Sequence, residues 1–415
     1  MKVLWFEVST PSCYVETNRV VTGWQDALEN IIKQQDLNIE LIIAFESSVY
    51  HEVKVINGIT YVPLNVKFSK FDYLNINYWE NKAKKIIPKA VEIIEKYKPD
   101  LIHVFGTEWP FGLVANYTDI PVVIHIQGSM IPYNNAMYPP GYNKYTIYKS
   151  FKWYIKKYVK HYLETMHSYS RERVEREIWK SVKYYMGRTE WDKALANIMH
   201  PDCFYYHVDE ALRPDFMNTA QKWIYHKTPR IQLLTIAHSG TWYWKGLDML
   251  LKTAHIMKNM NIEFEWKLAG GVPETMKNTI EKKECTTFKE NNVSFLGLTP
   301  PKELNNLLLN TTIYVHTSYV ENSPNAICEA QFLGVPIVST NVGGISTLCR
   351  DQKEATLVPA NDPWQMAYAI VNLSKNENLM NQYSANSISI SHQRHNEEII
   401  AFQLITCYKK ILKSI

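Results

Sequence analysis

The sequence has few features of secreted, membrane-spanning or metal-scaffold proteins. Its six cysteines are scattered and include no C-x-x-C pair, which argues against a disulfide framework and a zinc site and favours a reducing compartment. No run approaches the roughly 18 apolar residues that a membrane span needs. The opening MKVLWFEVS becomes polar too soon for a signal peptide and is typical of a buried strand. We therefore expect a cytoplasmic protein.

Motifs of several other protein classes are also missing. No G-x-G-x-x-G follows an expected strand, which disfavours a dehydrogenase. We find no known nucleic-acid-binding module, no alignable internal repeat and no low-complexity segment. The composition, 46% hydrophobic and 21% charged, is that of a globular protein. A chain of 415 residues is long enough for two domains with separate cores.

Strand-like apolar runs alternate with helical stretches along most of the chain. One series runs from MKVLWFEVS to PVVIHIQG, and a second runs from RIQLLTIAHS to TIYVHTS. This alternation predicts an α/β protein with parallel sheets covered by helices on both faces. We expect two doubly wound, Rossmann-like domains, at residues 1–216 and 229–395. Ligands of such sheets bind outside the carboxyl ends of the strands, so two facing domains would form a cleft.

Residues 143–185 stand out because they carry about seven more basic than acidic side chains, with tyrosine and tryptophan interleaved. The simplest interpretation is a solvated helical face. The alternative is a surface that rests on anionic lipid with its aromatic rings at the headgroup level. Nucleic acid is a weaker option, although single-stranded binders also mix basic and aromatic residues.

The stretch YVENSPNAICEAQFLGVPIVSTNVGG, residues 319–344, has a helix start and a helix stop. Ser323 is expected to cap a helix with Pro324 in its first position, and Gly334 is expected to end it. A buried strand and a Gly343-Gly344 turn then follow.

The same stretch places two carboxylates beside that helix start. Glu321 falls in the preceding loop and Glu329 near the second turn, from where it can lean back over Asn325 and Ala326. The first N–H groups of a helix favour an anion. A ligand with hydroxyls and phosphates would suit this arrangement, and a nucleotide-sugar is such a ligand.

The second half of the chain resembles the retaining nucleotide-sugar glycosyltransferases of family four, which have the GT-B fold. The resemblance covers about 150 residues, through WYWKGLDMLLKTA, WKLAGG, VSFLGLTPPKELNNLLLN, the stretch just described and LVPANDPWQMAYAI. The family's E-x7-E pair falls on Glu321 and Glu329. The first half matches more loosely through GWQDALENI, PDLIHVFGTE and PVVIHIQGS. GRTEWDKA and the E-x-LR of Glu210 to Arg213 resemble a bacterial branch that builds surface polysaccharides.

The resemblance assigns a role to each candidate donor-site residue. Lys245 would stabilise the departing diphosphate together with first-turn N–H groups, Glu321 would bind sugar hydroxyls, and Glu329 would bind the ribose hydroxyls. Gly23 would let backbone approach the donor phosphates, and Gln127 and His125 would touch the donor sugar. Base recognition would fall near Leu298 and Thr299. The donor-binding set is thus Gly23, Leu298, Thr299, Ser323, Asn325, Ala326 and Glu329.

Ordinary structural roles compete with several of these assignments. Lys245 and Glu321 could be solvated surface groups, Glu329 a partner of the helix dipole, Gly23 a turn glycine, and His125 a core histidine. The surrounding motif favours the functional interpretation for the first three.

Three departures from the family pattern matter. The position of a family arginine that grips the diphosphate is occupied by Gly240, and Arg188 is the candidate substitute, with a salt bridge as its ordinary role. Gln127 replaces a histidine at the end of a first-half strand, where His125 is the nearest alternative. The acidic residue often found after the paired glycines is absent from GGISTL.

The family implies transfer with retention, no cofactor and no metal, and the chain has no D-x-D of the kind that holds Mg²⁺ in the other glycosyltransferase fold. We expect transfer of a sugar to a saccharide or lipid-linked saccharide in surface-polysaccharide or glycan synthesis, and no nucleic-acid partner. A helix at about 396–415 should return to the first domain, as in relatives. The alternatives are a non-catalytic sugar- or nucleotide-binding protein, a nucleotide-sugar epimerase and a glycan phosphorylase, although no pyridoxal-lysine context is found.

Overall fold

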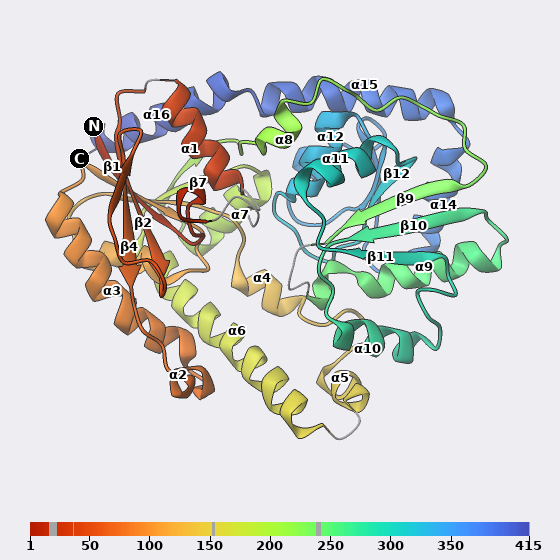
Figure 1. Cartoon of the computed structure of the whole chain (residues 1–415), viewed down its shortest axis with the longest axis horizontal. Helices are drawn as coiled ribbons and strands as arrows, with labels where there is room; N and C mark the ends of the chain where they lie inside the picture. The colour runs from red at the N-terminus through yellow and green to blue at the C-terminus, as the bar shows by residue number, and fades with distance from the viewer. Residues whose placement is uncertain (16–22, 36, 152–153, 238–241, 415) are drawn as a thin grey trace. The chain divides into compact units, whose positions relative to one another are not determined.

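The computed structural model describes residues 1–15, 23–35, 37–151, 154–237 and 242–414 (Figure 1). Its contacts divide the chain into two compact units. Unit 1 comprises Met1–Asn134, Val159–Arg213 and Arg394–Ile415. Unit 2 comprises Asn135–Tyr158 and Pro214–Gln393.

The sheet of unit 1 has the order β3-β4-β2-β1-β5-β6-β7-β8 within the described residues. All neighbours run parallel except the hairpin pair β3 and β4. The central strands are buried on both faces, which explains why they read as continuous apolar runs. The strands are β1 Lys2–Glu7, β2 Glu40–Ser47, β3 Lys54–Ile56, β4 Ile59–Asn65, β5 Leu101–Phe105, β6 Val122–His125, β7 Tyr184–Gly187 and β8 Phe204–His207.

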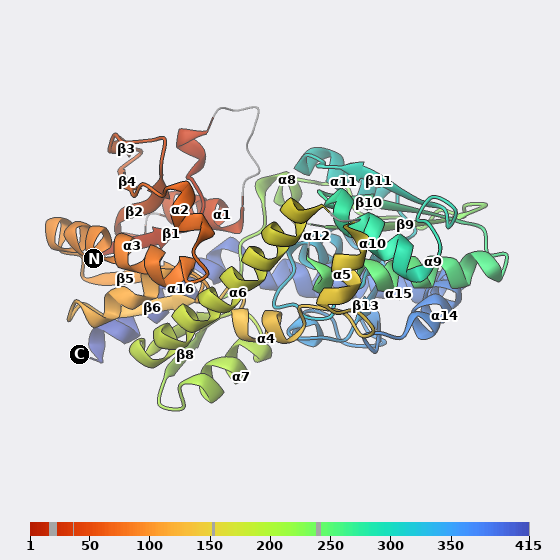
Figure 2. The ribbon, with the colours of Figure 1, turned by 90° about the horizontal axis from the view of Figure 1, so that it is seen from below.

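Helices cover both faces of this sheet, as Figures 1 and 2 show. One core contains residues of α1 and α16, and the other contains residues of α3 and α6. The doubly wound class predicted from the sequence is therefore confirmed for this unit. Its helices are η1 Ser12–Tyr14, α1 Trp24–Gln34, α2 Lys70–Leu74, α3 Tyr78–Tyr97, η2 Pro110–Asn116, α4 Met130–Asn135, α6 Ile155–Ser181, α7 Glu190–Met199 and α16 Glu397–Lys413, where α4 and α6 extend into residues of unit 2.

Unit 2 has a parallel sheet with the order β11-β10-β9-β12-β13-β14 in its described residues. It is doubly wound like the first, as predicted. Its strands are β9 Ile231–Ile236, β10 Phe264–Ala269, β11 Val293–Gly297, β12 Ile313–His316, β13 Ile337–Thr340 and β14 Ala355–Val358. Its helices are α5 Lys144–Ser150, α8 Pro214–Met217, η3 Tyr243–Lys245, α9 Leu247–Asn259, α10 Glu274–Glu284, α11 Pro301–Leu309, α12 Asn325–Leu333, α13 Ile345–Leu348, α14 Pro363–Ser374 and α15 Glu377–Arg394, whose last residue belongs to unit 1.

Residues 135–158 differ from the predicted domain bounds, because their contacts place them in unit 2 instead of the first domain. Polar contacts anchor the segment on α10. The Tyr142 hydroxyl donates to Glu284 at 2.7 Å, and the Ser150 and Thr279 hydroxyls lie 2.6 Å apart. These pairs join positions more than 120 residues apart in the chain, which local sequence patterns do not reveal.

Among the described residues, no helix combines the length and apolar character that crossing a bilayer requires.

The chain's last helix, α16, is fixed to the first sheet by a buried hydrogen-bonded chain. Trp5 Nε1 donates to the Tyr408 hydroxyl at 3.0 Å, and that hydroxyl lies 2.7 Å from His103 Nδ1. Burial lowers the pKa of His103 to about 3, so its ring is neutral at pH 7 and Nδ1 can accept the hydroxyl proton. All three side chains have at most a trace of exposure.

We predict that Tyr408→Phe lowers the free energy of unfolding by about 2–4 kcal/mol, because it leaves both Trp5 Nε1 and His103 Nδ1 buried without a partner. Urea denaturation measures the change. The matched control, Tyr368→Phe, lies on α14 with its side chain 71% exposed and should change stability by less than about 0.5 kcal/mol. Equal effects of the two substitutions would contradict this role for Tyr408.

Candidate functional site

The turn that carries Lys245 is pressed against the loop that follows β12. Gly246 has a φ of +73°, and a Cβ built on it would lie 1.8 Å from the carbonyl oxygen of Thr317, so only glycine fits. The Tyr319 N–H donates to the Trp244 carbonyl at 2.7 Å, and the Thr317 hydroxyl donates to the Lys245 carbonyl at 3.1 Å. The K-G pair therefore joins the loops after β9 and β12 at the carboxyl edge of the sheet.

Glu321 lies in this β12 loop, 4% exposed, and three donors converge on its Oε1 atom. They are Lys245 Nζ at 2.6 Å, the Ser318 hydroxyl at 2.8 Å and His316 Nε2 at 3.2 Å. These three contacts all end on Oε1 and leave Oε2 outside the set. One oxygen is thus held by the protein, and the other can accept a hydrogen bond from a ligand.

Electrostatics keep this carboxylate ionised. Burial acts to raise the pKa of Glu321, but the Lys245 charge and the hydrogen bonds from His316 and Lys245 outweigh it, so the pKa lies well below its usual range. Glu321 therefore enters the ion pair with Lys245 as a carboxylate anion at neutral pH.

His316 and Tyr314 support Glu321 and were not among the residues predicted from the sequence. The Tyr314 hydroxyl lies 3.2 Å from His316 Nδ1. If Nε2 carries the proton donated to Glu321, Nδ1 is the acceptor, and the Tyr314 hydroxyl donates to it. The available signal was the position of His316, a polar residue that ends the apolar run TIYV.

Glu329 is in the second turn of α12 and is 1% exposed. Burial first, and then the charges of Glu321 and Glu329, raise the pKa of Tyr314, so both carboxylates of the E-x7-E pair act on one tyrosine. The structure thus brings Glu321 and Glu329 to the same part of unit 2.

The start of α12 differs from the prediction by one residue. Pro324 is the N-cap and Asn325 the first helical residue, so the predicted cap at Ser323 is wrong. The Ser323 hydroxyl instead faces the Cys328 thiol at 3.8 Å, and the side chain is buried. The predicted stop is confirmed, because Gly334 ends the helix with a φ of +81°. Asn325 and Ala326 form the first turn and are half-buried.

The paired glycines support the Glu321 loop from the other side. Gly343 has a φ of +54°, and a Cβ there would lie 1.7 Å from the Glu321 carbonyl oxygen. The Gly344 N–H donates to the same oxygen at 3.1 Å. The glycines therefore hold the backbone of Glu321 through close approach.

Leu298 and Thr299 follow β11, the edge strand of the sheet. Leu298 is 73% exposed, and the Thr299 hydroxyl donates to the Gly297 carbonyl at 3.0 Å. They lie at the same carboxyl edge as Lys245 and Glu321, but β10 and β9 separate β11 from β12. Gly240, the position of the family arginine, lies outside the described residues.

In unit 1, His125 and Arg188 surround Trp24. The His125 ring is fully buried, and burial lowers its pKa. It meets the Trp24 ring edge-on at 4.8 Å, and the Arg188 guanidinium carbon lies 5.0 Å from that ring. Gly23 is the N-cap of α1, where its N–H donates to Asp26 at 3.2 Å.

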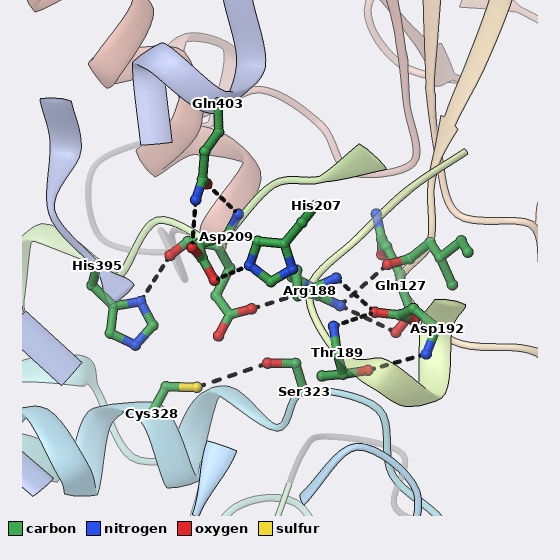
Figure 3. A network of polar contacts seen from close by, with 12 residues as sticks. Gln127, Arg188, Thr189, Asp192, His207, Asp209, Ser323, Cys328, His395 and Gln403 are labelled. Atoms are coloured by element: carbon green, nitrogen blue, oxygen red, sulfur yellow. Dashed lines mark hydrogen bonds and ion pairs between the residues drawn. The ribbon is translucent and has the colours of Figure 1, made fainter. Parts of the chain in front are cut away.

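Arg188 is 3% exposed and joins several segments of unit 1 (Figure 3). Its Nη2 atom donates to the carbonyls of Ile126 and Gln127 at 3.4 Å, and its Nε atom lies 3.4 Å from Glu210 Oε2. Its N–H donates to Asp192 at 2.8 Å. Glu210, which belongs to the E-x-LR motif, thus matches the charge of Arg188 within the unit.

A second buried carboxylate, Glu175, holds the loop that follows Gln127. The Thr107 hydroxyl donates to it at 2.5 Å, and the N–H groups of Met130 and Ile131 donate at 2.8 and 3.2 Å. Burial raises the pKa of Glu175 to about 7. The hydrogen bond from Thr107 acts to lower this pKa, and the charge of Glu108 acts to raise it further.

The GT-B fold consists of two doubly wound α/β units, and solved structures match this chain over its whole length. Sucrose-phosphate synthase from Thermosynechococcus elongatus matches with a TM-score of 0.71, 14% identity and full coverage of both chains. Anabaena Alr3699/HepE, solved with UDP-glucose, matches with a TM-score of 0.64, 14% identity and full coverage of both chains. At these identities the comparison shows the fold alone.

Residues 231–376 match the family described as glycosyl transferases group 1. WcaL of Escherichia coli K12, a glycosyltransferase assigned to colanic acid biosynthesis, is 26% identical over 157 residues, which cover 36% of this chain and 38% of WcaL. The amylovoran biosynthesis glycosyltransferase AmsK of Erwinia amylovora is 26% identical over 141 residues, 32% of this chain and 34% of AmsK. The matched region therefore covers less than half of this chain and less than half of each relative.

The resemblance to glycosyltransferase family four and its GT-B fold is confirmed. The chain is a distant homologue of the colanic acid and amylovoran glycosyltransferases.

We predict that stability falls as pH rises through the titration of Glu175. The unfolded carboxyl ionises near pH 4.5 and the folded one near 7, so the folded state keeps its proton longer and the free energy of unfolding drops by about 3 kcal/mol across this window. Glu175→Gln should flatten the profile between these pH values, measured by urea denaturation. Glu177→Gln, exposed on the same helix, should leave it unchanged. An unaltered slope in Glu175→Gln would refute the assignment.

Proposed function

We propose that the protein is a retaining glycosyltransferase that moves a sugar from a nucleotide-sugar to a saccharide or lipid-linked saccharide. The observation that carries this proposal is the Lys245–Glu321 pair, held by two close-approach glycines within the group 1 region. The relatives in colanic acid and amylovoran synthesis favour a surface polysaccharide as the product. We take a UDP-sugar as the first donor to test, because Anabaena Alr3699/HepE was solved with UDP-glucose.

In this proposal, the donor diphosphate binds Lys245 and the first N–H groups of α12, at Asn325 and Ala326. A cation and a helix N-terminus both stabilise negative charge, and fixed groups need no rearrangement as charge develops on the leaving diphosphate. Lys245 supplies the positive charge at this position, so we propose that transfer needs no metal and no cofactor.

The two glutamates bind hydroxyls. Oε2 of Glu321 accepts a hydrogen bond from the sugar while Oε1 stays with Lys245, Ser318 and His316. Glu329 accepts hydrogen bonds from the ribose. A buried, ionised carboxylate needs hydrogen-bond donors, and hydrogen bonds to a charged group are stronger than those to a neutral one. The hydrogen bonds from sugar and ribose hydroxyls to these glutamates would therefore be strong. Retention, with the acceptor attacking on the leaving-group face, follows from the family resemblance.

The remaining candidates receive lesser roles. We propose that Leu298 and Thr299 border the nucleotide base, that Ser323 shapes the loop before α12, and that Gly23 lets a ligand approach the start of α1. His125 has no exposed surface, so we assign it to positioning Trp24. Arg188 is assigned to positioning Gln127, whose carbonyl it contacts.

We also propose that the enzyme works in the cytoplasm at the inner face of the membrane, through part of the basic segment 143–185, where a lipid-linked acceptor would be available. A second candidate function is nucleotide-sugar binding without catalysis, which the glycine at position 240 and Gln127 favour. An epimerase is a further alternative. Release of free nucleoside diphosphate from the donor during turnover would distinguish a transferase from a binding protein and from an epimerase.

We predict that Lys245→Ala lowers the rate of UDP release from a UDP-sugar by about 100- to 1000-fold, because charge on the leaving diphosphate loses its cation. A coupled UDP-release assay with a panel of UDP-sugars measures the effect, with and without EDTA. Lys258→Ala, at an exposed position of α9, should behave as the unsubstituted protein in both conditions.

Full activity of Lys245→Ala would contradict the assigned role, and loss of activity in EDTA would contradict metal independence. Donor binding without UDP release by the unsubstituted protein would favour the binding-protein alternative.

A further inference from the structure

A group of large apolar side chains is exposed on two neighbouring segments of unit 1. On α2 and the turn after it, Phe71 is 84% exposed and Leu74 56%. On α6, exposed apolar residues recur at the spacing of one helical face. The set, here named the α2–α6 face, is Phe71, Tyr73, Leu74, Ile76, Val159, Tyr162 and Tyr169.

Direct contacts join the two segments into one surface. The His167 ring on α6 meets the Tyr73 ring edge-on, with centroids 4.9 Å apart, and its Nε2 atom lies 3.1 Å from the Asn75 carbonyl oxygen. His167 itself is buried, so it fixes the turn after α2 against α6. α2 is a short helix beside the middle of the much longer α6, around His167 (Figure 1).

The charges around this face leave it positive. Asp72 pairs with Lys85 at 2.7 Å, Glu80 pairs with Arg173, and Glu164 lies 3.7 Å from Lys160. The nearby carboxylates are thus each matched by a basic side chain. In contrast, Lys67 and Lys70 precede Phe71, are exposed, and make no ion pair with any described residue.

We propose that the α2–α6 face docks on an anionic phospholipid bilayer. Phe71 and Leu74 enter the acyl boundary, the tyrosine rings lie at the headgroup level with their hydroxyls toward water, and Lys67 and Lys70 meet lipid phosphates. An anionic membrane binds surfaces that combine three features: apolar residues that insert, amphipathic aromatic rings, and lysines without an acidic partner. The α2–α6 face and the lysines beside it have all three.

This proposal deepens the proposed function, since a docked unit 1 would meet a lipid-linked acceptor at the surface where that acceptor lies. It also extends the expected surface beyond the segment 143–185. The sequence prediction named the basic segment 143–185 alone, whereas Phe71, the most exposed large apolar residue of the part of the chain that the structure describes, lies outside it on α2. The chain brings α2 and α6 together although about 90 residues separate them, as with His167 and Asn75.

Vesicle flotation tests the proposal with the full chain. We expect the protein to float with vesicles of phosphatidylcholine mixed with phosphatidylglycerol, and to bind pure phosphatidylcholine at least about tenfold more weakly. The double substitution Phe71→Ser with Leu74→Ser should lower the partition coefficient at least about tenfold, because two inserted apolar side chains are lost. Lys67→Glu with Lys70→Glu should lower binding to the anionic vesicles alone.

Phe402→Ser is the matched control, because Phe402 is 72% exposed on α16 of the same unit. It should bind vesicles as the unsubstituted protein does. If the unsubstituted protein does not float with the vesicles, the proposal is overturned. A face that docks a soluble protein partner would produce this result. Equal losses in Phe402→Ser and the α2 double substitution overturn it as well.

UDP binding by the α2 double substitution, measured by titration calorimetry, keeps the two proposals separable. Unchanged UDP affinity with lost vesicle binding supports both. If the unsubstituted protein binds vesicles but does not bind UDP, the proposed donor site is refuted. The proposed docking face is then still supported.

Discussion

The buried Glu321 carboxylate and its Lys245 partner determine how the loops at the carboxyl edge of the unit 2 sheet are built. A carboxylate that is 4% exposed must be paired, and Lys245 Nζ at 2.6 Å supplies that pairing. The pair can form only because Gly246 and Gly343 permit backbone contacts that a Cβ would block. The two glycines therefore hold the loops at the distance that the ion pair needs. A side chain at either glycine would move Lys245 or Glu321 and weaken the pair.

Sequence patterns predict the fold and much of this site because its determinants are local. Alternating apolar strands and helices predict two doubly wound units, which the structure contains. The spacing of Glu321 and Glu329 across a helix start, and the stop at Gly334, follow from helix geometry and glycine conformation. The cap itself was misplaced, because a serine before a proline offers two adjacent residues that could begin the helix.

The features that sequence reasoning missed depend on contacts between distant segments. His316 gains a role only because β12 ends beside Glu321, and residues 135–158 belong to unit 2 only through partners such as Glu284. A salt bridge was the ordinary role expected of Arg188, but the sequence did not identify Glu210 as its partner. Periodicity shows which face of an element is apolar, but it does not show which other element will cover that face.

The central claim is that unit 2 holds a nucleotide-sugar donor through Lys245, Glu321 and Glu329. Titration calorimetry with UDP, GDP, ADP, dTDP and CMP tests it most directly, with Glu329→Ala alongside the unsubstituted protein. The account predicts that one nucleoside diphosphate binds in the micromolar range, that EDTA leaves the affinity unchanged, and that Glu329→Ala weakens binding at least about tenfold. Absence of binding by all five nucleotides, or undiminished binding by Glu329→Ala, would contradict it.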